Sequence, residues 1–274
     1  MRVLAVVCVR NEQVHIRRCL HDLIHHGVDV ILLDHASTDQ TLDIAHQFLD
    51  RGLIKIEHLS WSGFFNLSDQ LKAKSNLFNR YRGEYDWVAH FDADEEIVVK
   101  PLYSCLLDAV CAADEAGFNC LNFNEFVMMP PRNQQALPDV EEFGGEHLDY
   151  YFFQNRYPRL MRVWKNNLNF DNVSAGGHLL QGENLRLYPV DFSLKHYIVL
   201  SHQHALSKYS KRSFSPEELS KGWHLNRVNI NADTINRFFD GSMNCENRLF
   251  SLPDSESSSF EINYPQSSHF WEWN

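Results

Sequence analysis

The stretch that decides the fold is residues 3–33, VLAVVCVRNEQVHIRRCLHDLIHHGVDVILL. It begins with an apolar, valine-rich run at 3–9, which is typical of a buried strand. Apolar residues from 16 to 24 then recur at helical spacing, and Gly27 marks the end of that helix. A second apolar run at 28–33 follows directly. This strand–helix–strand unit predicts an α/β protein.

The same alternation continues along the chain. The further predicted elements are a helix carrying Leu42 to Leu49 behind N-cap candidates at 37–39, strands at 53–59 and 87–91, helices at 68–82 and 102–116, strands at 118–126, 150–153 and 159–164, and a helical tail from about 204 with Pro216 in a first turn. This order implies a parallel sheet with helices on both faces. We expect three segments, 1–126, 127–203 and 204–274, with a long loop at 130–148.

Composition narrows the possible functions. The 274 residues include 25 Lys and Arg against 36 Asp and Glu, which gives a net charge of -11. The protein as a whole is therefore not attracted to nucleic acid, and a polyanionic ligand must be held by a local basic patch or a metal ion. Hydrophobic residues at 44% and charged residues at 22% are typical of a globular protein and exclude a disordered or fibrous one.

Targeting signals and cysteines indicate the compartment. The apolar run at 3–9 is too short to span a bilayer and continues into Arg10 instead of a cleavage site of small residues. We therefore expect no signal peptide and a cytoplasmic protein, with at most peripheral association at the inner face of a membrane. The 6 cysteines form no CxxC pair, so we expect reduced thiols and no structural zinc.

An acidic cluster, DADEE at 92–96, follows the predicted strand at 87–91. Ligands of parallel α/β sheets bind beyond the carboxyl ends of the strands. Crowded carboxylates are costly unless a cation neutralises them, and Mg²⁺ shares its oxygen ligands with substrate phosphates. Asp92 and Asp94 are two residues apart, so both can face one site. They are candidate ligands of a metal that carries a diphosphate; the alternatives are a solvated acidic loop or N-capping by Asp94.

Three segments carry a family resemblance: VCVRNE at 7–12, LDHASTDQT at 33–41 and WVAHFDADE at 87–95. Together they resemble the family 2 glycosyltransferases with a GT-A fold. The resemblance implies a mixed, mostly parallel, Rossmann-like sheet flanked by helices, with a helical C-terminal extension. It also implies a nucleotide-sugar donor, a divalent cation (Mn²⁺ or Mg²⁺) and an inverting transfer. Segment 1–126 would then bind the nucleotide sugar, and 127–203 the acceptor.

The resemblance also assigns nucleotide contacts. In such enzymes the end of the first strand and the Asp-x-x-Ser-Thr-Asp segment hold the nucleoside, which here implicates Val9, Arg10, Glu12, Asp34 and Asp39. Many members of the family carry two adjacent acidic residues at this point, whereas this chain has Asp34 followed by His35. The alternative interpretations are a helix N-cap for Asp39, a solvated loop for Arg10, and closure of the strand turn by Asp34.

The second half carries two further similarities. Leu194-Lys195-His196-Tyr197 and the run KYSKR at 208–212 resemble the C-terminal part of related family 2 enzymes. The resemblance implies that His196 completes the metal shell and that Lys208, Lys211 and Arg212 cover the diphosphate. The alternative for His196 is a buried, hydrogen-bonded histidine, and the alternative for the basic run is a solvated helical face.

An inverting transfer needs a base that removes the proton of the acceptor hydroxyl. Relatives often place His-Glu or Glu-Asp after a turn that contains glycine. Here Gly176-Gly177-His178 is followed by Leu179, so the expected acid is absent. His178 and Asp171 are the leading candidates for the base, and Asp191 and Glu146 are further alternatives. The alternative role for His178 is to orient the acceptor.

The sequence therefore predicts an inverting, metal-dependent glycosyltransferase that acts on a glycan or lipid-linked acceptor in bacterial polysaccharide or surface-glycan synthesis. One rival is a sugar-1-phosphate nucleotidyltransferase, but the glycine-rich phosphate loop that it needs after the first strand is missing. The other rival is a non-catalytic carbohydrate-binding protein of the same fold. The acidic cluster argues against it, because an unused cluster would be a pure electrostatic cost.

Overall fold

The computed structural model describes residues 1–136, 148–209, 212–228, 230, 232–252 and 260–273. The chain forms two compact units. The first comprises Met1–Trp61, Leu67–Asn124 and Pro158–Leu194, and the second comprises Ser62–Asn66, Glu125–Tyr157 and Lys195–Asn274. Two strands, β6 (Cys120–Met129) and β9 (Phe192–His196), continue from the first unit into the second. None of the described helices combines the length and apolarity that a membrane span needs.

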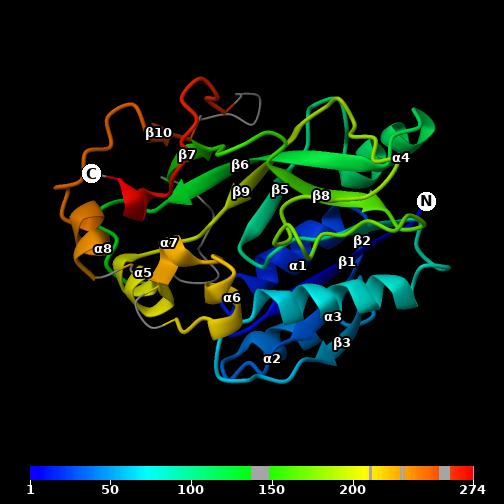
Figure 1. Cartoon of the computed structure of the whole chain (residues 1–274), viewed down its shortest axis with the longest axis horizontal. Coiled ribbons are helices and arrows are strands. Elements are labelled where there is room, and N and C mark those ends of the chain that lie inside the picture. Colours follow the sequence, from blue (N-terminus) through cyan, green and yellow to red (C-terminus); the bar gives the residue numbers. More distant parts are fainter. Residues whose placement is uncertain (137–147, 210–211, 229, 231, 253–259, 274) are drawn as a thin grey trace. The chain divides into compact units, whose positions relative to one another are not determined.

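The first unit is built on a mixed sheet with strand order β3-β2-β1-β4-β8-β6 (Figure 1). The strands are β1 (Val3–Val9), β2 (Val28–Asp34), β3 (Leu53–His58), β4 (Trp87–Ala89), β8 (Leu160–Lys165) and the first half of β6. Strands β1 to β4 are parallel, and β8 runs antiparallel to both β4 and β6. The short strand β5 (Glu95–Val98) pairs with β9. The predicted mixed, mostly parallel sheet is confirmed.

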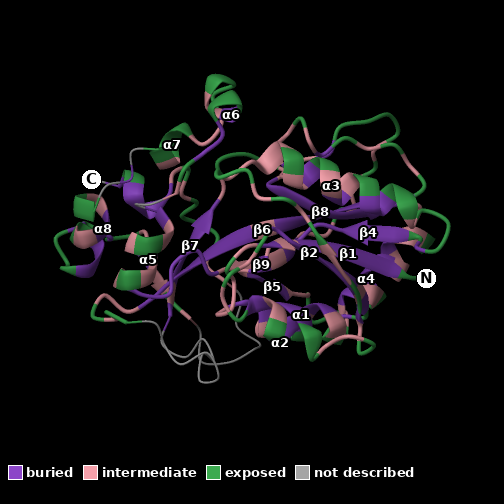
Figure 2. Ribbon diagram, turned by 90° about the horizontal axis from the view of Figure 1, so that it is seen from below, coloured by how far each residue is buried: buried purple, intermediate pink, exposed green. Residues whose placement is uncertain are grey.

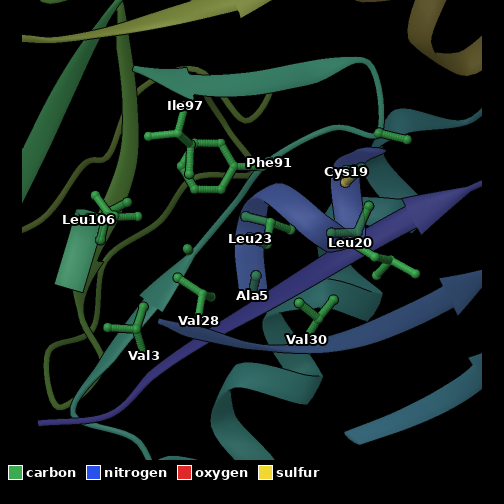
Figure 3. Packing of buried hydrophobic residues seen from close by; sticks show 14 of the residues in the cluster. Val3, Ala5, Cys19, Leu20, Leu23, Val28, Val30, Phe91, Ile97 and Leu106 are labelled. Carbon is green, nitrogen blue, oxygen red and sulfur yellow. The ribbon is translucent and has the colours of Figure 1, made fainter. Parts of the chain in front are cut away.

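Helices cover both faces of this sheet, as predicted (Figure 2). The helices are α1 (Ile16–His25), α2 (Thr41–His46), α3 (Leu67–Arg80) and α4 (Leu106–Glu115). Alternate residues of β1 point to opposite faces. Val3, Ala5 and their neighbours pack against α1, α2 and α4 (Figure 3), whereas Leu4 and Val6 pack against α3. Because both faces are covered, the strands are apolar throughout.

Some predicted boundaries shift. The strand predicted at 87–91 ends at Ala89, because His90 and Phe91 leave the ladder to form the loop that carries the acidic cluster. The helix predicted to reach Leu49 ends at His46, since the chain must already turn to pair Leu49 with Leu53. The strand predicted at 118–126 extends to Met129.

The second unit has its own apolar core. Its strands are the second half of β6, β7 (Asp149–Phe153) and β10 (Phe250–Ser251), all antiparallel. Its helices are α5 (His202–Tyr209), α6 (Pro216–Ser220), α7 (Leu225–Val228), α8 (Ala232–Phe239) and the 3-10 turn η1 (Phe270–Glu272). Pro216 opens α6, as predicted for a first helical turn. Tyr151 and Phe153 of β7 pack against α8 and η1, which explains why the tail folds back on this unit.

Candidate functional site

The carboxyl ends of β1 and β2 bring several predicted nucleotide residues together. Val9 lies opposite Asp34 in the parallel register. Arg10 follows Val9, and its Nη1 donates to the carbonyl oxygen of His35 at 2.8 Å and also to that of Ala36. Arg10 is therefore held by the neighbouring loop and is not a freely solvated side chain.

The loops after β1 and β2 are also joined through Asp39. Its Oδ2 accepts a hydrogen bond from the Gln13 amide at 3.2 Å, and its Oδ1 accepts one from the Thr41 amide at 2.9 Å. The Glu12 amide donates to Thr41 Oγ1 at 2.8 Å. Asp39 thus stabilises the first turn of α2, as the N-cap interpretation predicted, although the cap position itself is Gln40. Nucleotide contacts by Glu12 and Asp39 stay predictions.

Asp34 closes the turn after β2. Its side chain is buried, and both carboxylate oxygens accept from the Ser37 amide, at 3.2 and 3.3 Å. His58 Nδ1 lies 3.5 Å from Asp34 Oδ2. The turn-closing interpretation of Asp34 therefore describes its contacts well, and its contact with a nucleotide stays a prediction.

Trp61 is a site candidate that the sequence reasoning missed. The Arg10 guanidinium lies 4.0 Å from the centroid of the Trp61 ring, and the His35 ring packs edge-on against the same indole at 5.0 Å. His35 Nε2 donates to the Ser60 carbonyl at 3.1 Å, so its Nδ1 accepts from Gln70 Nε2 at 3.3 Å. Burial lowers the pKa of His35, which fits this neutral tautomer. The residue that departs from the family pattern is thus a buried, neutral support for Trp61.

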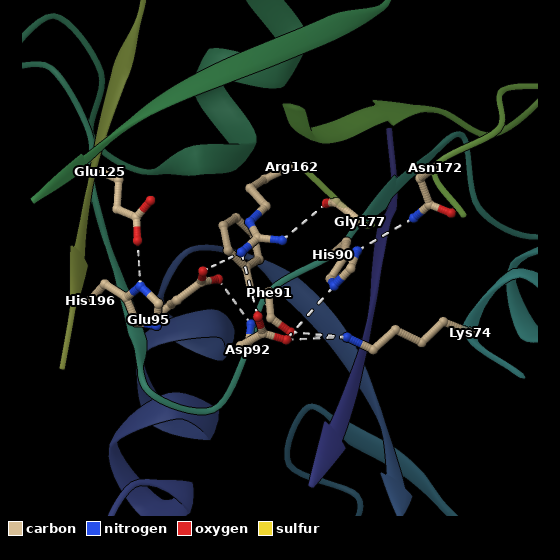
Figure 4. Close-up of polar contacts among 10 residues, drawn as sticks. All are labelled: Lys74, His90, Phe91, Asp92, Glu95, Glu125, Arg162, Asn172, Gly177 and His196. Carbon is tan, nitrogen blue, oxygen red and sulfur yellow. Dashed lines mark hydrogen bonds and ion pairs between the residues drawn. The ribbon is translucent and has the colours of Figure 1, made fainter. Parts of the chain in front are cut away.

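The acidic cluster is organised around Asp92 (Figure 4). Lys74 Nζ lies 3.6 Å and His90 Nε2 lies 3.7 Å from Asp92 Oδ1, and Arg162 Nη2 lies 3.5 Å from Asp92 Oδ2. The three basic side chains are 2–3% exposed, whereas that of Asp92 is 46% exposed. A carboxylate that faces solvent is therefore supported from behind by three buried nitrogen donors.

This arrangement fixes the protonation states. Burial, helped by the charge of Lys74, lowers the pKa of His90 to about 3. His90 is therefore neutral, with Nδ1 accepting from Asn172 and Nε2–H facing Asp92. Burial alone would raise the pKa of Asp92, but Lys74, the His90 N–H and Arg162 together hold it well below its usual range. Asp92 is ionised at every physiological pH.

Protein cations compensate the cluster. Arg162 pairs with both Asp92 and Glu95, and Arg18 Nε lies 3.9 Å from Glu96 Oε2. Asp92, Glu95 and Glu96 therefore already have a positive partner within the protein, and their crowding requires no bound cation. The acidic cluster by itself does not demand a metal.

The donor set still fits a divalent cation. No group of three or more His, Cys, Asp and Glu side chains within the described part of the chain is arranged as a complete metal site. Mg²⁺ needs no such group, because it binds through one or two carboxylates together with substrate phosphates and water. Asp92 offers ionised, half-exposed oxygen atoms, and Asp94 is also partly exposed. These residues suit a cation that arrives with a diphosphate.

The structure brings the glycine turn of the predicted base next to Asp92. Arg162 Nη1 donates to the Gly177 carbonyl at 3.2 Å. Gly177 has φ +78°, and a Cβ built on it would lie 2.7 Å from His90 Cε1, so only glycine fits this contact. His178, the next residue, accepts at its carbonyl from the Met161 amide at 2.8 Å. The predicted base thus follows a turn that packs on the groups supporting Asp92.

The other candidates for the base have structural contacts. Asp171 accepts from the Ser174 hydroxyl and amide, and these bonds, above all that of the hydroxyl, lower its pKa. A lowered pKa makes Asp171 a weaker base at neutral pH. Asp191 accepts from Asn122 Nδ2 at 2.8 Å. Glu146 lies outside the described residues.

In the second unit, His196 is held by a buried carboxylate. Its Nδ1 lies 2.6 Å from Glu125 Oε1 (Figure 4), and the Glu125 side chain is 3% exposed. Nδ1 therefore carries the proton that it donates to the Glu125 carboxylate. A carboxylate that orients histidine in this way is common behind metal ligands. Metal binding by His196 stays a prediction.

The predicted basic run also lies in the second unit. The Arg212 guanidinium lies 4.9 Å from the Phe65 ring centroid and 6.0 Å from that of Tyr209. Lys208 Nζ lies 6.0 Å from the Tyr209 centroid, at the end of α5. Lys211 lies outside the described residues. Diphosphate binding by this run stays a prediction.

Five residues of the candidate site were given no role from the sequence: Lys74, His90, Arg162, Trp61 and Glu125. One signal was available. Lys74 falls on the buried stripe of α3, three residues from Leu71 and from Leu77, where a charge is unexpected. No comparable signal marks Arg162, Trp61 and Glu125, because contacts between separate strands and loops, not spacing along the chain, bring them to their partners.

Comparison with protein families supplies a match over much of the chain. The family model described as "Glycosyl transferase family 2" aligns with residues 4–169. That range contains the acidic cluster and the loops after β1 and β2. A search of curated proteins gave no match.

Several solved structures are similar. Residues 1–349 of S. aureus TarS in complex with UDP share 16% identity at a TM-score of 0.45, over 87% of this chain and 70% of that one. The longer S. aureus TarS structure shares 15% identity at a TM-score of 0.44, and the match covers 43% of it. The mannosyltransferase PcManGT from Pyrobaculum calidifontis, in complex with GDP-Man and Mn²⁺, shares 14% identity at a TM-score of 0.38, over 88% of this chain and 73% of that one.

Proposed function

The chain belongs to glycosyl transferase family 2, and from this premise we propose that it transfers a sugar from a nucleotide-diphosphate donor to an acceptor hydroxyl with inversion. The observation that carries the proposal is Asp92, ionised and half exposed in front of three buried nitrogen donors. A carboxylate fixed in this way is preorganised for a cationic or hydrogen-bonding partner. The loops after β1 and β2, where Arg10 packs on Trp61, lie at the same edge of the parallel sheet.

Asp92 and Asp94 are the residues that would hold a divalent cation. Such a cation supplies Lewis-acid stabilisation of the leaving diphosphate. Lys74 and Arg162 keep Asp92 ionised, and they limit how far its carboxylate can turn. The roles in metal and diphosphate binding predicted for His196, Lys208 and Arg212 belong to this proposal as untested parts.

Binding of the nucleoside is assigned to the edge formed by Val9, Arg10 and Asp34, with Trp61 added. An indole that is already stacked on a guanidinium offers a planar surface on which a base can pack. The donor nucleotide is left open, because the neutral His35 replaces the second acid of the family pattern.

His178 is our candidate for the base, ahead of Asp171. It follows the Gly177 turn, whose carbonyl is bonded to Arg162 beside Asp92. In an inverting transfer the base removes the acceptor proton while the hydroxyl attacks the anomeric carbon opposite the leaving diphosphate. The acceptor is proposed to be a glycan or a lipid-linked glycan of a bacterial surface polysaccharide.

One observation favours a second candidate function. Because Lys74 and Arg162 already compensate carboxylates of the cluster, these carboxylates cost a non-catalytic carbohydrate-binding protein little electrostatic free energy. The acidic cluster is therefore compatible with a carbohydrate-binding protein as well as with a transferase.

The test is hydrolysis of UDP-, GDP- and dTDP-sugars with and without Mn²⁺. Slow release of nucleoside diphosphate supports a transferase, pyrophosphate chemistry supports a nucleotidyltransferase, and no turnover supports a binding protein. Asp92→Asn and Asp94→Asn should each abolish the metal-dependent release. Asp43→Asn, an exposed change on α2, is the control. Circular dichroism checks that the variants fold; full activity in folded Asp94→Asn would refute the metal assignment.

A further inference from the structure

A groove on the outer side of α1 and α2 lies apart from the residues discussed above. It has a volume of about 360 Å³. Arg17, His21 and His25 line it from α1, and Arg51 lines it from the turn after α2. The three residues of α1 are four apart and therefore share one face of the helix. The opposite face of α1 is buried in the core, so this face is the outer one.

The lining is basic although the chain is acidic. Two arginines and two histidines line the groove, together with Gln47, Ile24 and Phe48, and no carboxylate does. The other lining groups thus leave the two guanidinium charges uncompensated, in a chain of net charge -11.

Several other basic residues of the first unit have acidic partners. Examples are Arg2 with Asp29 at 2.9 Å, Arg80 with Glu57 at 2.6 Å, and Lys165 with Asp114 at 2.5 Å.

The arginines of the groove differ. Arg17 Nη1 donates to the neutral amide oxygen of Gln47 at 3.1 Å, and among the described residues neither Arg17 nor Arg51 is within ion-pair distance of a carboxylate. Arg18, next to Arg17 in sequence, faces Glu96 instead. Two guanidinium groups that have no carboxylate partner among the described residues therefore line the same groove.

The turn that carries Arg51 is fixed by close packing. Gly52 has φ +107°, and a Cβ on it would lie 2.5 Å from Ile24 Cγ1. The backbone thus lies directly against α1, which holds Arg51 beside the helix. Asp50 also adopts a positive φ, 60°. The geometry of the groove is therefore set by the backbone and not by side chains alone.

We propose that this groove binds a phosphate or pyrophosphate group. Guanidinium groups form paired hydrogen bonds with phosphate oxygens, and imidazole N–H groups add donors. The volume suits a small ligand, and Ile24 and Phe48 offer apolar contacts for the carbon skeleton that carries the phosphate. The proposal is independent of glycosyl transfer, because no residue of the groove is assigned to that reaction. The phosphate can belong to a dissolved small molecule or to a lipid headgroup.

The experiment compares wild-type protein with Arg17→Gln/Arg51→Gln and with the control Arg82→Gln. Arg82 is also in the first unit, but it bonds to Asn79 and Asn169. Calorimetric titration with sodium pyrophosphate, without divalent cations, measures the soluble source. Co-sedimentation with phosphatidylcholine vesicles, with and without phosphatidylglycerol, measures the lipid source.

We expect one of the two probes to bind, and the double variant to lose about tenfold or more in affinity while Arg82→Gln does not. Binding of pyrophosphate alone identifies a soluble ligand, and binding only to phosphatidylglycerol vesicles identifies a headgroup. The proposal is overturned if neither probe binds, or if the double variant binds as the control does. Thermal unfolding confirms that the variants are folded. Because the experiment measures binding and not turnover, its result for the groove does not depend on whether the proposed transferase activity is correct.

Discussion

The ammonium group of Lys74 lies 3.6 Å from Asp92 Oδ1, and the lysine side chain is 2% exposed whereas that of the aspartate is 46% exposed. Burying a lysine is costly unless a negative partner compensates it. Asp92 is that partner, so the acidic cluster stabilises α3 as well as presenting a carboxylate to solvent. The pair links the stability of the first unit to the chemistry proposed for it.

Lys74→Met should therefore affect stability and function together. The change leaves Asp92 with Arg162 as its remaining cationic partner and raises the pKa of Asp92 toward the usual value. We expect a loss of about 1–2 kcal/mol in the free energy of unfolding, kept small because solvent screens the half-exposed carboxylate. Urea denaturation measures it. Lys72→Met on the same helix, where an exposed lysine lies 3.9 Å from Asp69, is the matched control and should change little. Equal effects of the two changes would contradict the role of Lys74.

The pH dependence of stability should contain a contribution from His26. Burial lowers its pKa; its Nδ1 accepts from the Leu106 amide at 3.2 Å, which requires an unprotonated nitrogen. The unfolded state thus binds a proton more readily, and stability falls as the pH decreases below about 6.5, by at most about 1.4 kcal/mol per pH unit. His26→Gln should show a shallower loss between pH 7 and pH 5 than the wild type in paired urea titrations. Parallel curves would show that His26 does not titrate as inferred.

Trp61→Ala should weaken nucleotide binding. The indole positions Arg10, and its loss frees the guanidinium that is held at the ends of β1 and β2. We expect the dissociation constant of the preferred nucleoside diphosphate to rise about tenfold, in line with one lost cation–π or stacking contact. Trp61→Phe should retain most of the affinity because it keeps a flat ring. Calorimetry with UDP, GDP and dTDP measures both, and unchanged binding by Trp61→Ala would remove Trp61 from the site.

Glu125→Gln tests the orientation of His196. The carboxylate fixes the Nδ1–H tautomer, and an amide of the same shape accepts more weakly. If His196 binds metal, the affinity for Mn²⁺ should fall about tenfold or more, as for other carboxylates behind metal-bound histidines. Electron paramagnetic resonance of free Mn²⁺ gives the affinity without an activity assay. The exposed Glu115→Gln is the control. A titration unchanged in both Glu125→Gln and His196→Ala would exclude the histidine from metal binding.

The sequence predicted the alternating elements of the first unit well, because buried parallel strands and amphipathic helices each leave a pattern along the chain. It also singled out Asp92 as a candidate ligand, since ligand sites follow strand ends. It did not find Lys74 or Arg162, and so it attributed the neutralisation of Asp92 to a metal. Arg162 comes from β8, more than sixty residues later, and no periodicity records a contact between strands paired across a sheet.

The two glycines before His178 offer the sharpest structural test, because they differ in one contact. Both have positive φ, 63° at Gly176 and 78° at Gly177, so alanine at either position costs about 1 kcal/mol in backbone strain. A Cβ at Gly176 meets nothing within 4 Å, whereas one at Gly177 would lie 2.7 Å from His90 Cε1. Gly177→Ala should therefore destabilise the protein by about 1–3 kcal/mol more than Gly176→Ala. It should also reduce turnover more, because His90 would be displaced from behind Asp92. Urea denaturation and nucleotide-sugar hydrolysis measure the two differences, and equal values for the two variants would show that this turn does not support the acidic cluster.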